Sequence, residues 1–121
     1  MTKTILIVED YEDTRRFMRI LLESYGYEVI EATDGIEAID KFKFSHPDLI
    51  LMDISLPMVD GLTAVKAIRE LSEEKQIPII AVTAFSQDYS KNALQVECDE
   101  IINKPIDVDR LQPMLNQYLG I

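Results

Sequence analysis

The chain contains 121 residues, which suits one domain, because domains typically contain about 100–150 residues. Apolar residues make up 47% of the sequence and charged residues 28%, a composition that excludes a disordered or low-complexity protein. The net charge of −10 repels the phosphate backbone of nucleic acids, so we expect no direct binding of DNA or RNA. We therefore predict a single domain that spans residues 1–121.

The sequence shows no signal for export or for a membrane. Its one cysteine, Cys98, has no second cysteine with which to form an internal disulfide, and no basic N-terminal segment precedes an apolar run. The longest apolar stretches fall short of the roughly 20 residues that a membrane-spanning helix needs. We expect a cytoplasmic protein without a membrane segment.

Strand and helix patterns alternate along the whole chain. Five short runs rich in leucine and β-branched residues predict strands, and they cover Thr4 to Val8, Glu28 to Ala32, Asp48 to Met52, Pro78 to Val82 and Glu100 to Asn103. Each run is followed by a segment with the apolar spacing of a helix. These segments contain Met18, Leu21, Leu22 and Tyr25, then Ala38, Ile39 and Phe42, then Leu62, Val65 and Ile68, then the weaker stretch from Gln87 to Val96, and last Val108, Leu111, Leu115 and Leu119. Helix caps are predicted at Asp34, paired with Glu37, and at Asp60 and Asp107.

The alternation predicts a parallel sheet covered on both faces. A helix between two strands carries the chain back along the sheet, so that consecutive strands run in the same direction. Runs such as Ile5 to Val8 and Leu49 to Met52 are apolar at every position, as strands buried on both faces are. We predict an α/β fold, a three-layer α/β/α sandwich with a five-stranded parallel sheet.

Polar side chains follow four of the predicted strands at their carboxyl ends, where open parallel sheets bind ligands. They are Glu9 and Asp10, Asp53, Thr83 and Lys104. Each one alone has a structural explanation as a helix cap, a strand end or a solvated charge. Together, clustered carboxylates need a cation, and oxygen ligands suit Mg²⁺. A carboxylate, a hard metal ion and an ammonium group at one place indicate phosphoryl chemistry.

The motifs at these positions resemble those of response regulator receiver domains, specifically the stand-alone, CheY-like type. The matching segments are ILIVED at 5–10, LILMDISLPMVDG at 49–61, VTA at 82–84 and KP at 104–105, and the resemblance covers the whole chain. It implies a flavodoxin-like (βα)5 fold with strand order 2-1-3-4-5. It also implies a cis peptide bond between Lys104 and Pro105.

The resemblance further implies a role for each site residue. Asp53 is the expected phosphoacceptor, supplied by a phosphohistidine on a sensor kinase or a histidine phosphotransfer protein. The implied Mg²⁺ ligands are Asp10 and Asp53 directly, Glu9 through a water molecule, and the backbone carbonyl of Ser55. Thr83 and Lys104 are expected to bind phosphoryl oxygens.

We therefore expect a signalling domain that assists its own phosphorylation and dephosphorylation, not an enzyme that turns over small molecules. Its expected partners are the kinase or phosphotransfer protein and a downstream protein target, and it should be a monomer or weak dimer. Two alternatives stay open. One is a receiver excised from a longer regulator or hybrid kinase. The other is a small phosphohydrolase of the haloacid dehalogenase type, although such enzymes place a second aspartate two residues after the nucleophile, where this chain has Ser55.

Some residues depart from the family pattern, and some apolar ones lie outside the predicted core. Ile101 stands where the family usually has an aromatic residue, three positions before the lysine, and Glu97-Cys98 replaces the usual Gly-Ala. In the first predicted helix, Phe17 and Ile20 fall outside the apolar face, which predicts a surface for a partner helix.

Overall fold

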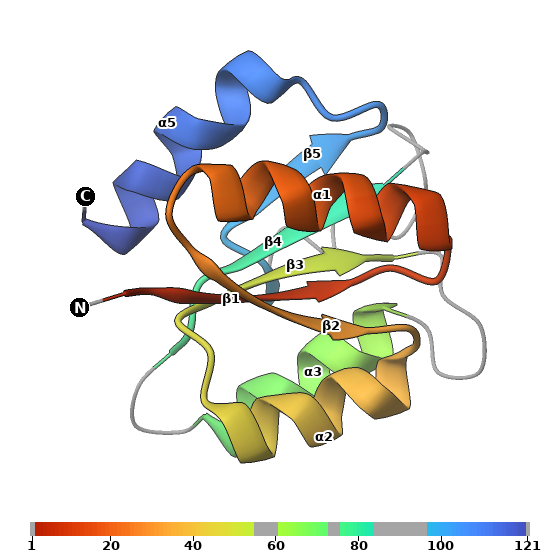
Figure 1. Cartoon of the computed structure of the whole chain (residues 1–121). Helices are drawn as coiled ribbons and strands as arrows, with labels where there is room; N and C mark the ends of the chain where they lie inside the picture. Colours follow the sequence, from red (N-terminus) through yellow and green to blue (C-terminus); the bar gives the residue numbers. More distant parts are fainter. Residues whose placement is uncertain (1, 55–60, 73–75, 84–96, 121) are drawn as a thin grey trace.

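A computed structural model describes residues 2–54, 61–72, 76–83 and 97–120 of the protein (Figure 1). Within them, one parallel sheet contains five strands in the order β2-β1-β3-β4-β5, which confirms the predicted topology. The strands are β1 (Thr4–Val8), β2 (Glu28–Ala32), β3 (Leu49–Asp53), β4 (Ile79–Thr83) and β5 (Glu100–Asn103).

Strands β3 and β4 begin and end one residue later than predicted. Proline has no N–H group to donate at the start of β4, and Pro78 instead offers its carbonyl to the N–H group of Ile50. At the other end of the sheet, the hydrogen bonds from Ile54 N to Val82 O and from Lys104 N to Thr83 O extend the ladder. Asp53 and Thr83 are therefore the last residues of their strands.

The helices cover both faces of the sheet, as the sandwich prediction requires. In Figure 1, α1 (Glu12–Ser24) and α5 (Val108–Leu119) lie on one face, and α2 (Gly35–Ser45) and α3 (Gly61–Leu71) lie on the other. The helix predicted for 87–96 lies outside the described residues. Among the helices that the structure describes, none is long and apolar enough to cross a membrane.

Strand side chains alternate between two hydrophobic cores. Ile5 and Ile7 of β1 pack with Leu22 of α1 on one face. Leu6 and Val8 belong to the core on the opposite face, next to α2 and α3. All five side chains are essentially inaccessible to solvent, so β1 is a central strand covered by helices on both faces.

The predicted caps that fall on described residues are present. The Asp34 carboxylate accepts a hydrogen bond of 2.7 Å from Glu37 N at the start of α2, and Asp107 accepts one from Asp109 N at the start of α5. Asp60 lies outside the described residues. Both caps hold a helix start directly after a sheet-to-helix loop, and they stabilise the ends of α2 and α5 that lie near the carboxyl edge of the sheet.

Gly61, the first residue of α3, packs against the strand end that carries Asp53. A Cβ atom at Gly61 would lie 2.5 Å from the carbonyl oxygen of Asp53 and 2.6 Å from the Cα atom of Ile54. Gly61 N donates a hydrogen bond of 3.1 Å to Ile54 O. In the sequence, Gly61 is only the last residue of the motif at 49–61, but the structure shows that it permits a close backbone approach beside Asp53.

We predict that Gly61→Ala lowers the free energy of unfolding by about 1–3 kcal/mol, because the added methyl group must displace backbone atoms. Urea unfolding followed by circular dichroism measures this change. Lys66→Ala, an exposed substitution in the same helix, is the control and should change stability little. Equal stability of Gly61→Ala and the wild type would contradict the close packing.

Candidate functional site

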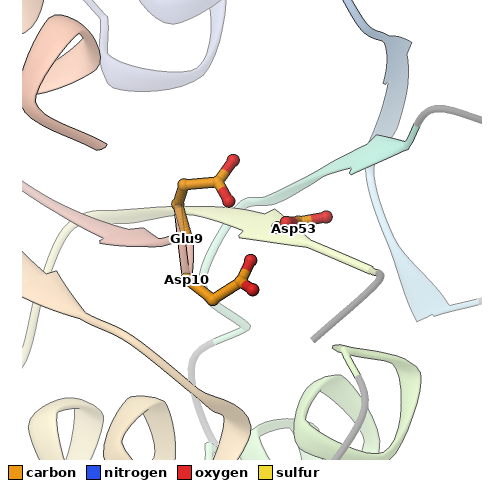
Figure 2. Close-up of side chains that lie close together, drawn as sticks. All are labelled: Glu9, Asp10 and Asp53. Atoms are coloured by element: carbon orange, nitrogen blue, oxygen red, sulfur yellow. The ribbon is translucent and has the colours of Figure 1, made fainter. Parts of the chain in front are cut away.

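Three carboxylates meet at the carboxyl edge of the sheet. Strands β1 and β3 are neighbours, with Val8 opposite Met52, so Glu9 and Asp10 leave β1 beside Asp53 at the end of β3. One carboxylate oxygen from each of the three lies within 4.8 Å of the others. Figure 2 shows the three side chains around a common space. Glu9 and Asp53 are buried, whereas Asp10 is exposed to solvent.

Lys104 joins this cluster from the edge strand on the far side of β4. Its Nζ atom lies 3.0 Å from Oε1 of Glu9 and 3.2 Å from Oδ2 of Asp53. One ammonium group therefore pairs with both buried carboxylates at once. The peptide bond between Lys104 and Pro105 is cis, as the resemblance predicted.

Thr83 lies at the end of β4, the strand between those that carry Asp53 and Lys104. It is buried, and its carbonyl oxygen accepts a hydrogen bond of 2.8 Å from Lys104 N. In the ladder, Asp53 is opposite Val82 and Thr83 is opposite Asn103. The structure thus collects Glu9, Asp10, Asp53, Thr83 and Lys104 along one edge, while Ser55 lies outside the described residues.

The surroundings keep Lys104 protonated. Partial burial alone would lower its pKa, but the hydrogen bonds and charges of Glu9 and Asp53 outweigh that effect and raise the pKa above the usual 10.5. The folded state therefore holds this proton more tightly than the unfolded chain does. The stabilisation is fully present at neutral pH and is lost only as the pH rises through the pKa of Lys104.

The main chain around Glu9 is held by partners that the sequence did not reveal. Glu9 N donates to Ala32 O on β2 over 3.0 Å, and Tyr11 N donates to Oε2 of Glu9 over 3.1 Å. Arg15 Nη1 donates to the carbonyl oxygen of Glu9 over 3.0 Å. Arg15 belongs to a helix whose sequence pattern marks only its apolar face, so no signal in the sequence pointed to this contact.

The donor set of the cluster fits a hard divalent cation. Glu9, Asp10 and Asp53 offer only oxygen atoms, and they lie close enough together to share one ion. Mg²⁺ prefers oxygen ligands, and it is usually held by one or two carboxylates together with water. The residues present therefore suit Mg²⁺ better than a metal ion that selects thiolate or imidazole ligands.

The structure accommodates the three departures from the family pattern, two by packing and one by its backbone conformation. Ile101 is half-buried and packs against the core on the α3 side of the sheet. Cys98 is buried, and burial raises the pKa of its thiol to about 12, so it packs as a neutral, apolar side chain. Glu97, which stands where the family usually has glycine, is not in the left-handed region. In the described part of the chain, His46 is the one non-glycine residue with a positive φ angle.

Sequence comparison places this arrangement among known proteins. Residues 5–116 match the family model of the response regulator receiver domain. The chain is 45% identical to the polar-differentiation response regulator DivK of Brucella ovis over 121 residues, which cover 99% of this chain and 98% of that protein.

Solved structures show the same fold. The receiver domain of a sensor histidine kinase from Pseudomonas aeruginosa is similar over the full length of both chains, with a TM-score of 0.91 and 33% identity, and it holds a magnesium ion in its active-site cleft. The response regulator TrrA of Thermotoga maritima, solved with Mg²⁺ and beryllofluoride, has a TM-score of 0.87 and 32% identity over 97% of this chain and 99% of that one.

We predict that Lys104→Met lowers the free energy of unfolding at neutral pH, because two buried carboxylates lose their shared cation. The difference in the free energy of unfolding between Lys104→Met and the wild type should decrease as the pH rises through the raised pKa of Lys104, because the wild-type ammonium group then loses its proton. Urea unfolding across this alkaline range, without divalent cations, measures it. Lys66→Met, on an exposed part of α3, should differ little from the wild type at any pH. A deficit for Lys104→Met that stays constant with pH would contradict the role of the charge.

Proposed function

Because this chain belongs to the response regulator receiver family, we propose that Asp53 accepts a phosphoryl group from a phosphohistidine on a sensor kinase or a histidine phosphotransfer protein. The observation that carries this proposal is the pairing of the buried Asp53 carboxylate with Lys104, beside Glu9 and Asp10. The protein is thus a receiver domain of two-component signalling, and the proposed step is its phosphorylation.

The proposed step uses Asp53 as a nucleophile. A carboxylate oxygen of Asp53 forms a bond to phosphorus as the bond between phosphorus and the donor imidazole breaks, and the imidazole leaves with that electron pair. Lys104 lies 3.2 Å from Asp53, where its ammonium group can pair with a phosphoryl oxygen. Thr83, at the end of the adjacent strand, is the proposed hydroxyl donor to another oxygen.

We further propose that Asp10, Asp53, Glu9 through water, and the backbone carbonyl of Ser55 hold Mg²⁺. When bound, Mg²⁺ supplies positive charge that offsets the charge of the carboxylates and of the transferring phosphoryl group. The clustered carboxylate oxygens of this chain support the proposal. So do the magnesium ions in the structures of the P. aeruginosa and T. maritima receivers.

The product is a signal and not a released metabolite. We propose that residues 1–121 act as one receiver domain in the cytoplasm, that phosphorylation stops at one phosphoryl group per chain, and that the phosphorylated form binds a downstream protein. The comparisons do not favour the phosphohydrolase alternative, because the family match covers residues 5–116 and places the chain among receivers.

We predict that acetyl phosphate with Mg²⁺ adds one phosphoryl group to the wild type and none to Asp53→Asn, because the amide lacks the nucleophilic oxygen. Intact-mass spectrometry measures the adduct. Asp40→Asn removes an exposed carboxylate from α2 and should be labelled like the wild type. Labelling of Asp53→Asn, or release of phosphate in large excess over protein, would contradict the proposal.

The exposed face of α1 is the proposed docking surface for the phosphodonor. Phe17 is 53% exposed and Ile20 is 63% exposed, so both project from the helix as the sequence pattern predicted. Helix α1 begins two residues after Asp10, so a helix docked on this face lies close to the phosphoacceptor. Exposed apolar side chains of this kind often mark a protein interface.

We predict that Phe17→Ala slows phosphotransfer from a phosphohistidine donor but leaves labelling by acetyl phosphate unchanged, because only the protein donor must dock. The rate of phosphotransfer from the phosphorylated donor measures the effect. Phe44→Ala is the matched control, since Phe44 is 83% exposed and belongs to α2, the helix that covers the opposite face of the sheet from α1 (Figure 1). Equal losses with both phosphodonors would contradict a docking role.

A further inference from the structure

Arg15, in the first turn of α1, links the loop that carries the acidic pair to the edge strand β2. Its Nη1 atom donates a hydrogen bond of 3.0 Å to the carbonyl oxygen of Glu9, and its Nε atom lies 3.4 Å from Oε1 of Glu31 on β2. The side chain is only 16% exposed. A guanidinium group presents its donors in a fixed plane, so one arginine can hold both acceptors in a defined arrangement.

Arg15 contacts the main chain of Glu9 and not its side chain, so the contact controls the orientation of a peptide group. The carbonyl of Glu9 and the N–H group of Asp10 belong to one planar peptide group. Fixing the direction of that carbonyl therefore fixes the plane from which the Asp10 side chain departs. The Glu9 carboxylate is held separately, by Tyr11 N and by Lys104.

We propose that Arg15 is a positioning residue for the Mg²⁺ site: it orients the Glu9–Asp10 peptide so that the Asp10 side chain converges with Glu9 and Asp53. This inference rests on the proposed function, because it concerns the same metal site. Mg²⁺ demands near-ideal ligand geometry, so a small rotation of this peptide should weaken binding. Glu31 acts one step further away, by holding the guanidinium group.

Arg19 provides an internal comparison. It pairs with the same Glu31 at 2.6 Å and with Glu23 at 3.4 Å. Its charge equals that of Arg15, and it lies on the next turn of the same helix. The difference is that Arg15, and not Arg19, donates to the carbonyl of Glu9. Comparing variants of the two arginines therefore distinguishes the effect of the contact with Glu9 from the effect of the ion pairs between α1 and β2.

Charge and position predict effects of opposite sign. Removing a positive charge near three carboxylates makes the local potential more negative, which should tighten the binding of a divalent cation. Removing a positioning contact should weaken it. Weaker binding after loss of Arg15 therefore cannot result from the lost charge.

The test measures Mg²⁺ affinity by isothermal titration calorimetry, well below the melting temperature of each protein. We expect Arg15→Met to weaken Mg²⁺ binding by about tenfold, the lower end of the effect of outer-shell residues on metal affinity. Arg19→Met should leave the affinity unchanged or slightly raised. Arg15→Lys, which keeps the positive charge but loses the planar guanidinium group that spans both acceptors, should show an intermediate loss of affinity, and it also serves if Arg15→Met does not fold.

The outcomes are distinct. Unchanged or tighter binding by Arg15→Met would overturn the inference, and so would equal weakening by Arg15→Met and Arg19→Met, which would indicate a general effect of the ion pairs. In both of these cases the wild type still binds Mg²⁺ and is still labelled at Asp53, so the proposed function stands. A wild type that neither binds Mg²⁺ nor is labelled by acetyl phosphate would overturn both.

Discussion

The ammonium group of Lys104 pairs with two buried carboxylates, and the arrangement of the site depends on this interaction. A parallel sheet brings the ends of its strands to one edge, so acidic residues that follow β1 and β3 must lie side by side. Buried like charges repel one another and are costly without a cation. Lys104, reaching across from β5, pairs with Glu9 and Asp53 and stays protonated throughout the neutral range.

Strand pairing and main-chain contacts outside the carboxylate cluster hold this charged edge in place. Strands β1 and β3 pair in parallel with Val8 opposite Met52, and this register determines which residues emerge together at the carboxyl edge. Gly61 lets α3 approach the backbone of Asp53, and Arg15 holds the backbone of Glu9. Each of these contacts is made to the main chain. The carboxylates face other partners: Lys104 pairs with Glu9 and Asp53, Tyr11 N donates to Glu9, and a cation can join the three.

Much of this could be predicted from the sequence because its signals are local. The alternation of strand and helix patterns predicted the parallel sheet, and the polar residues after four of the strands predicted a site at its carboxyl edge. The strand order came from the family resemblance, since the spacing of elements does not fix which strands are neighbours. The roles of Arg15 and Gly61 could not be predicted, because each depends on a tertiary contact with main-chain atoms that the sequence pattern does not indicate. Ile101 shows the same limit, since only the structure shows that it packs into the core on the α3 side.

The structure of the protein crystallised with Mg²⁺ and beryllofluoride, a mimic of the phosphoryl group, tests the central claim most directly. The account predicts beryllium on a carboxylate oxygen of Asp53, Mg²⁺ held by Asp10 and Asp53, and Lys104 Nζ moved from Asp53 to a fluorine atom. Beryllofluoride bound at another residue would contradict it. A beryllofluoride complex in which no Mg²⁺ lies between the carboxylates and Lys104 still pairs with both Glu9 and Asp53 would also contradict it.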